Sequence, residues 1–364
     1  MAEIKKDILY HEIKDRIVSG KYEPGMRLPK EVDLAIELEV ARGTLRPALQ
    51  RLEEEELLRR VKGKGTFVSG QKQRLYLTVA EDIIALNRPP VHIARGIEAR
   101  MREAGNSIYF CSTHDLRQLT IEDAIERFHG LNIQGIFLIE SNFLGNEPEI
   151  ALFQGLGLPV VLPQAQSWDR EIMPTFAFCH PRWDVSFTAG LRYLAAQGHR
   201  RVAIISDHVD YPKGCLEIAF SEYKSLYDAS GLEYRPEYIT HVSENPSSQR
   251  KIDISTTVTA LLKSSAPPTA FYCISDAHAD AVYSTVKELN LRIPEDISVL
   301  GYYGLPGGVF MSPPLTTVDL GLESRGRLAA SIMLRAGEWF EPGGRAPVVY
   351  PDYKILKRGS VAPR

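Results

Sequence analysis

The spacing of apolar residues changes once along this 364-residue chain, near residue 70. Before that point, apolar residues recur at helical intervals within a charge-rich stretch, whereas beyond it short apolar runs alternate with amphipathic segments. Short apolar runs between such segments are typical of strands in a parallel sheet. The change predicts three parts: a small helical domain over residues 1–70, a polar linker over 71–74 and an α/β domain over 75–364.

Three helices followed by a β-hairpin are expected in the first 70 residues. Helical spacing of apolar residues covers 7–19, 31–38 and 42–55, and β-branched residues flank the glycines of LLRRVKGKGTFVSG. This order is that of a winged helix-turn-helix, whose third helix enters the major groove of DNA. The formal net charge of −3 does not oppose DNA binding, because a whole-chain charge says little about one face.

The segment that begins IVSGKYEPG and ends GKGTFV resembles the DNA-binding domain of the GntR family. Its most specific parts are PGMRLPKE at 24–31, RGTLR at 42–46 and GKGTFV at 63–68. The resemblance implies that the third helix touches bases and phosphates and that the glycine-containing wing comes close to DNA. The expected DNA contacts are Lys30, Arg42, Thr44, Arg46, Lys62, Gly63, Lys64 and Gly65.

Two positions depart from the GntR pattern. Val32 stands where some members have a DNA-contacting arginine, and Ala41 stands where a serine or threonine commonly caps the third helix. The operator sequence therefore does not follow from the resemblance. Taken singly, a basic residue such as Lys30 is equally compatible with an ordinary surface charge.

Beyond residue 75, strands and helices are expected to alternate twice, giving two lobes with parallel sheets. The expected strands are LYLTV, SIYFC and GIFLI in the first lobe and TFAFC, VAII, AFYCI and SVLG in the second. The expected helices cover 91–104, 121–131, 183–197, 216–230 and 276–289. The first lobe is assigned to about 75–165 and 313–339, and the second to about 166–312 and 340–360.

The strings AAQGHRRVAIIS, IPEDISVLGY and SPPLTTVDLGLESRGRLAASIML resemble the effector domain of the LacI/GalR family. This resemblance implies the fold of periplasmic sugar-binding proteins. A GntR-type head on such a sensor is the layout of the arabinose-repressor group. It implies a homodimeric repressor of carbohydrate-related genes that a small sugar-like effector releases from double-stranded operator DNA. The sign of the response stays open, because a corepressor would use the same parts.

Ligands of such folds bind at the carboxyl ends of the strands, between the lobes. The candidate effector contacts follow strand ends: Asp82, Glu140, His180, Trp183, Asp207, Asp276 and Tyr303. A carboxylate accepts hydrogen bonds from sugar hydroxyls, and an aromatic ring stacks on a sugar. Other interpretations stay open: Asp276 as the cap of a helix, His180 as a turn residue and Trp183 as a core residue.

The effector domain also departs from its relatives where they bind sugars. The family's Asp-Asn pair aligns with Cys179 and His180, its binding arginine with Leu216, and the aspartate of its Gly-Phe-Asp with Tyr303. We therefore expect an effector other than a standard hexose or pentose, or a pocket that uses other groups.

Composition and missing motifs narrow the alternatives. Hydrophobic residues make up 44% of the chain and charged residues 24%, as in globular proteins. No signal peptide, apolar membrane span, dinucleotide or phosphate loop, nucleophile elbow or C-x-x-C pair is present. We expect a cytoplasmic protein with no cofactor, no metal and no membrane partner, and not an enzyme. An enzyme or a solute-binding protein with the same two-lobed fold is the alternative.

Overall fold

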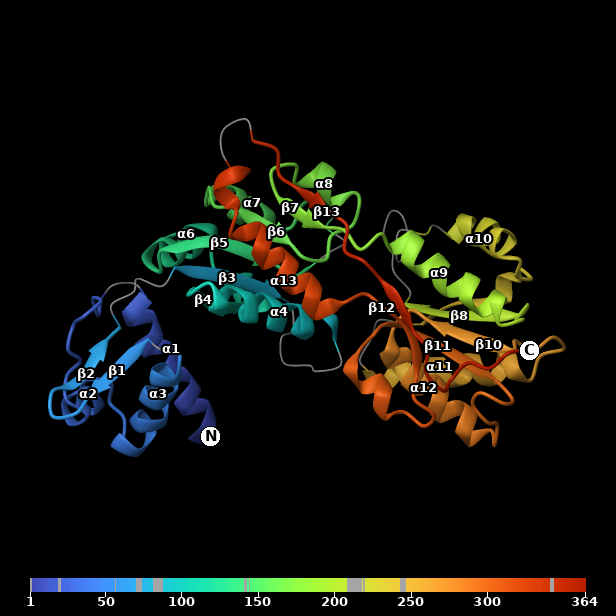
Figure 1. Cartoon of the computed structure of the whole chain (residues 1–364), viewed down its shortest axis with the longest axis horizontal. Helices are drawn as coiled ribbons and strands as arrows, with labels where there is room; N and C mark the ends of the chain where they lie inside the picture. The colour runs from blue at the N-terminus through green and yellow to red at the C-terminus, as the bar shows by residue number, and fades with distance from the viewer. Residues whose placement is uncertain are drawn as a thin grey trace. The chain divides into compact units, whose positions relative to one another are not determined.

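Figure 1 shows a computed structural model of the chain. The structure describes residues 2–18, 21–55, 57–69, 74–80, 88–140, 143, 145–207, 218, 220–242, 247–340 and 344–364. The expected linker lies outside these residues except for Arg74. The chain clusters into two compact units: Met1–Thr78 with Met101–Ile136 and Pro148–Leu158, and Val79–Arg100 with Phe137–Glu147 and Pro159–Arg364.

The N-terminal elements confirm the expected winged-helix order. They are α1 (Ala2–Val18), α2 (Glu31–Glu37), α3 (Arg42–Glu54), β1 (Leu58–Val61) and β2 (Gly65–Val68). The two strands pair antiparallel, from Leu58 opposite Val68 to Val61 opposite Gly65. Pro47 lies inside α3, which continues past it to Glu54. We call residues 2–68 the winged-helix region.

One apolar core holds the winged-helix region together. Leu45, Leu49 and Leu52 of α3 pack with Ile13 of α1 and Leu34 of α2, and none of the five is more than 2% exposed. Full burial of one such side chain contributes about 1.5–3 kcal/mol. Because these positions recur every three or four residues, they fix which face of α3 points outward.

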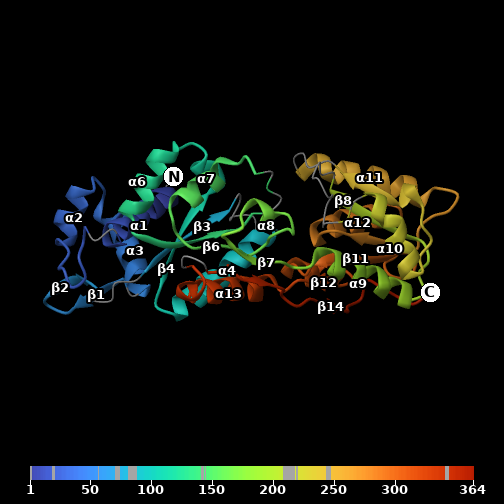
Figure 2. The same cartoon turned by 90° about the horizontal axis from the view of Figure 1, so that it is seen from above.

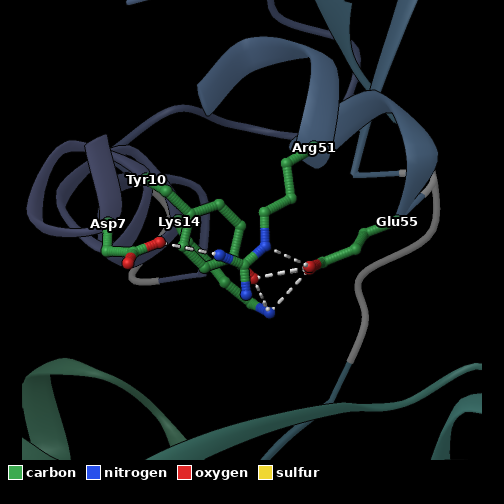
Figure 3. Close-up of polar contacts among 5 residues, drawn as sticks. All are labelled: Asp7, Tyr10, Lys14, Arg51 and Glu55. Carbon is green, nitrogen blue, oxygen red and sulfur yellow. Dashed lines mark hydrogen bonds and ion pairs between the residues drawn. The ribbon is translucent and has the colours of Figure 1, made fainter. Parts of the chain in front are cut away.

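A polar cluster ties α1 to the end of α3 (Figure 3). Glu55 accepts a hydrogen bond from the Tyr10 hydroxyl at 2.7 Å and pairs with the Lys14 ammonium at 2.8 Å. The Arg51 guanidinium lies over the Tyr10 ring at 3.9 Å and pairs with Asp7 at 3.1 Å. Arg51 of α3 thus contacts two residues of α1.

The remaining strands form two six-stranded sheets. The first has the order β13-β7-β6-β5-β3-β4 and the second β14-β12-β11-β10-β8-β9. The first contains β3 (Leu75–Ala80), β4 (Ser107–Ser112), β5 (Ile133–Leu138), β6 (Val160–Leu162), β7 (Ala177–Cys179) and β13 (Val348–Val349). The second contains β8 (Val202–Asp207), β9 (Ile239–Val242), β10 (Ala270–Cys273), β11 (Ser298–Tyr303), β12 (Thr316–Asp319) and β14 (Lys354–Leu356).

Helices cover the sheets (Figures 1 and 2). They are α4 (Pro89–Glu103), α5 (Thr113–Leu116), α6 (Ile121–Gly130), α7 (Pro148–Gly155), α8 (Asp169–Ile172), α9 (Trp183–Ala196), α10 (Tyr223–Ser230), α11 (Ser247–Leu262), α12 (Asp276–Glu288) and α13 (Leu322–Met333). Short 3-10 turns cover Phe220–Glu222, Pro236–Tyr238, Pro306–Phe310 and Ala336–Glu338.

Alternate residues of the second sheet face different helix pairs. Val202 and Ile204 of β8 pack in one cluster with α9 and α10, whereas Ala203 and Ile205 pack in another with α11 and α12. A strand buried on both faces needs a continuous apolar run, which is what the sequence shows. The expected parallel-sheet architecture is confirmed, with β14 added antiparallel to β12.

The expected lobe limits are wrong at three strands. TFAFC was assigned to the second lobe, but its β7 pairs with β6 and β13 in the first sheet. Residues 313–339 were assigned to the first lobe, but β12 pairs with β11 in the second sheet. Residues 340–360 were assigned to the second lobe, but β13 pairs with β7 in the first sheet. The chain thus changes sheet after β7, after β12 and after β13. The sequence analysis also missed the strands β6, β9, β12, β13 and β14 and the helices α5, α7, α8 and α11.

Candidate DNA-binding surface and effector site

The start of α3 presents basic side chains to solvent. Arg42 and Arg46 are exposed, while Leu45 between them is fully buried, so the packing of Leu45 turns both arginines outward. Thr44 is half-buried on the same turn. Ala41 has the extended backbone of an N-cap but no side chain that bonds the helix. The amide groups of this first helical turn thus lack a side-chain acceptor from the cap residue.

Glu31 of α2 organises the basic residues of this surface. Its Oε2 lies 2.9 Å from the Arg46 Nε, and its Oε1 lies 3.8 Å from a guanidinium nitrogen of Arg60. The hydrogen bond from Arg46 lowers the pKa of the Glu31 carboxyl, so Glu31 is ionised at neutral pH. Sequence reasoning missed Glu31 and Arg60, because a charge count does not show which charges meet.

The wing tip is basic and exposed. Lys62, Gly63 and Lys64 are exposed between β1 and β2, and Lys30 is exposed just before α2. Gly63 and Gly65 both have left-handed backbone, with φ of +75° and +115°. A side chain at Gly65 would also lie 2.8 Å from the Arg27 Nε. Arg27 is thus a further cation beside the wing that the sequence analysis did not select.

Asp276 is held by its own domain. It is 2% exposed, and its two carboxylate oxygens accept hydrogen bonds from the Leu305 amide at 2.5 Å and the Thr317 hydroxyl at 2.6 Å. Burial raises its pKa to about 7, although these hydrogen bonds partly oppose the rise. The cap of α12 is Ser275, which accepts from the Ala277 amide, so Asp276 is not the helix cap.

Two of the expected effector contacts, Trp183 and Tyr303, lie in ring-to-ring contact with each other. Trp183 opens α9, is 1% exposed and donates its indole N–H to the Ala165 carbonyl at 3.1 Å. The Tyr303 ring lies edge-on at 6.0 Å from it. Tyr303 ends β11 with a φ of +91°, a left-handed conformation that is costly for a bulky residue and is found mostly at functional sites.

The remaining candidates are His180, Glu140, Asp207 and Asp82. His180 lines a polar hollow of about 670 Å³, whose lining residues are Ser167, His180, Arg182, Asp184, Ile218, Glu222, Ser225, Leu226 and Tyr350. Glu140 follows β5 and is half-buried. Asp207 is the last residue of β8, but its side chain lies outside the described residues, as does all of Asp82.

Two family profiles match the chain. Residues 5–68 match bacterial regulatory proteins of the gntR family, and residues 191–361 match the periplasmic binding protein-like domain. The chain joins a GntR-type DNA-binding domain to a periplasmic-binding-protein-like domain. It is a transcriptional regulator, as expected from the sequence.

Relatives extend the comparison. The regulator is 24% identical to the arabinose metabolism transcriptional repressor of Geobacillus stearothermophilus, over 97% of this chain and 96% of that protein. Its fold is similar to a LacI transcriptional regulator from Bacillus cereus, with a TM-score of 0.65, 20% identity, and coverage of 80% and 99%. A LacI family regulator from Enterococcus faecium with bound ribose gives a TM-score of 0.62, 17% identity, and coverage of 80% and 100%.

These relatives are regulators rather than enzymes, which confirms the corresponding expectation. Within the described residues, no helix of the regulator is both long enough and apolar enough to cross a membrane.

Proposed function

We propose that the regulator is a repressor of carbohydrate-related genes that binds operator DNA through its winged-helix region and is released by a small sugar-like effector. The observation that carries the DNA-binding part is the exposed basic surface of Arg42, Arg46 and the wing, held on one apolar core and oriented by Glu31. The proposed DNA contacts are Lys30, Arg42, Thr44, Arg46, Lys62, Gly63, Lys64 and Gly65.

The effector class is inferred from relatives. One relative regulates arabinose metabolism by its name, and one structure of the same fold holds ribose. The proposed effector contacts are Asp82, Glu140, His180, Trp183, Asp207, Asp276 and Tyr303. The strained backbone of Tyr303 and its contact with Trp183 favour these two as part of the site. The internal hydrogen bonds of Asp276 favour a supporting role for that carboxylate.

The proposed mechanism is a population shift. Residues 1–70 act as the DNA-binding domain, 71–74 as the linker and 75–364 as the sensor, and two copies form a homodimer. Ligand favours one arrangement of the sensor, which alters the spacing of two winged-helix regions relative to two half-sites. Only a difference in ligand affinity between the two arrangements shifts operator affinity.

A two-step experiment tests ligand response. Thermal shift against sugars, sugar acids, sugar alcohols and nucleosides identifies a ligand, because saturation at 100 times Kd stabilises by roughly 2.7 kcal/mol. Fluorescence anisotropy then measures operator affinity with and without it. The expected result is an operator Kd at least tenfold weaker with ligand. An operator Kd that is unchanged by a saturating ligand contradicts the proposal.

A further inference from the structure

Arg325 is a fully buried cation in the first turn of α13. Its side chain is 1% exposed, and its Nε, Nη1 and Nη2 have no hydrogen-bond partner among the residues that the structure describes. A guanidinium carries five N–H donors and keeps its charge at all relevant pH. Burial of such a group without a partner strongly opposes folding, so arginine is retained at such a position only where another requirement selects it.

No described neighbour of Arg325 accepts a hydrogen bond from its guanidinium. Its guanidinium carbon lies 5.9 Å from the centre of the Trp183 ring, and this cation–π contact provides no hydrogen-bond acceptor for its donors. Burial raises the pKa of the nearby Cys179 thiol to about 12, so that group stays neutral. The Asp319 carboxylate acts on the cation through space, but it accepts from the Gly321 amide at 2.8 Å and lies 3.6 Å from the Lys354 ammonium.

The guanidinium of Arg325 lies near residues that end three strands. Cys179 ends β7, Tyr303 ends β11 and Asp319 ends β12, and all three act electrostatically on the guanidinium. The carboxyl ends of parallel strands are where this kind of fold binds ligands. Trp183 and Tyr303, which the sequence nominates for the effector, therefore share their surroundings with a cation whose donors are all free.

We infer that Arg325 binds an anionic group of the effector, a carboxylate or a phosphate on a sugar-like molecule. This inference rests on the proposed ligand response and specifies its chemistry. Both groups offer several oxygen acceptors in the geometry that matches a guanidinium fork, so either would satisfy the free donors. It also accounts for the loss of the polar contacts that the family uses for neutral sugars, since a charge pair replaces them.

The test compares neutral and anionic members of matched pairs. Purified full-length protein is titrated with glucose and glucuronate, galactose and galacturonate, ribose and ribose 5-phosphate, and glucose and glucose 6-phosphate, with thermal shift and calorimetry as readouts. The variants are Arg325→Met, which removes the charge at similar length, and Arg325→Lys, which retains it. Arg192→Met, on the exposed face of α9, is the matched control. The carboxylate and phosphate pairs distinguish the two sources of the anion.

The expected result is that an anionic member raises the melting temperature while its neutral partner does not. Arg325→Met should lose at least 100-fold in affinity for that ligand, Arg325→Lys should retain part of it, and Arg192→Met should bind like the wild type. Without ligand, Arg325→Met should melt no lower than the wild type, because it removes an unpaired buried charge.

Three results would overturn the inference: equal binding of neutral and anionic members, ligand binding that survives in Arg325→Met, or no stabilisation by any anionic member. A measurement of operator binding by the unliganded Arg325→Met protein distinguishes failure of the anion assignment from failure of the proposed function. If the wild type and this variant both bind DNA, only the anion assignment is wrong. If neither protein binds DNA, the proposed function itself fails.

Discussion

The Nε of Arg46 lies 2.9 Å from the Oε2 of Glu31, which places an acidic residue of α2 against a basic residue of the proposed recognition helix. A carboxylate near DNA repels phosphates, but it also holds the arginine in one orientation. Such a pair lowers the affinity for DNA of any sequence. Because it fixes the orientation of the arginine, it also increases the preference for one sequence over others.

Glu31→Gln should therefore lower sequence discrimination. We expect operator affinity to fall about tenfold, which is roughly 1.4 kcal/mol, while affinity for a scrambled duplex stays equal or rises. Anisotropy titrations with both duplexes measure the ratio. Glu54→Gln, which removes an exposed carboxylate from the end of α3, is the control. Equal changes for both duplexes in the Glu31 variant would contradict an orienting role.

Lys62 and Lys64 of the wing should contribute through phosphate contacts. Each lost contact is expected to lower the slope of log affinity against log salt concentration by about 0.9. Lys62→Met and Lys64→Met should weaken operator and scrambled duplexes alike, because phosphates carry no sequence. Anisotropy over a range of salt concentrations gives the slope. An unchanged slope in both variants would mean that the wing does not touch the backbone.

Helices α4 and α13 should not tolerate a side chain at their crossing. A Cβ at Gly326 would overlap the Ile93 carbonyl, and a Cβ at Gly96 would overlap the Glu323 carbonyl. Overpacking of this kind typically costs about 1–3 kcal/mol, so Gly326→Ala should lower the free energy of unfolding by that amount. Gly130→Ala, at the end of α6 with open space around it, should be neutral or slightly stabilising. Urea unfolding measures both, and equal stability of the two variants would contradict the packing.

Asp276 should make stability depend on pH. Its pKa is about 7 in the folded protein and ordinarily 3.8, so the folded state holds a proton that the unfolded state releases between these values. The contribution is fully present below about pH 4 and is lost as the pH rises through 7. Between pH 5 and 8, the free energy of unfolding should fall more steeply for the wild type than for Asp276→Asn. Parallel curves would contradict the raised pKa. Asp228→Asn, an exposed carboxylate on α10, should follow the wild type.

Much of the architecture is predictable from local pattern. The helices and wing of the winged-helix region follow from apolar spacing and glycine positions, since each element is decided by residues a few positions apart. Strand partners are not local. The run that became β7 was recognised as a strand, but its pairing with β6 and β13 depends on residues up to 170 positions away, such as Val348 opposite Phe178.

The DNA-binding surface and the effector site also combine features that local sequence predicts with features that only tertiary contacts decide. Arg42 and Arg46 are recognisable from their motif, but their link to Glu31 and Arg60 appears only in three dimensions. Asp276 was placed at a strand end correctly, yet its partners Leu305 and Thr317 lie 29 and 41 residues further along the chain. Arg325 was not selected at all, because an arginine in an amphipathic helix is usually a surface charge and its burial results from tertiary packing.

The central claim is that the basic surface of α3 recognises a specific DNA sequence. The most direct measurement is selection of bound duplexes from a random library by the full-length protein, repeated with an Arg42→Ala, Arg46→Ala double variant. The account predicts that the wild type enriches one sequence with two related half-sites, and that the double variant loses at least 100-fold in affinity for it. Enrichment of no sequence, or equal binding of the selected duplex by the double variant, would contradict it.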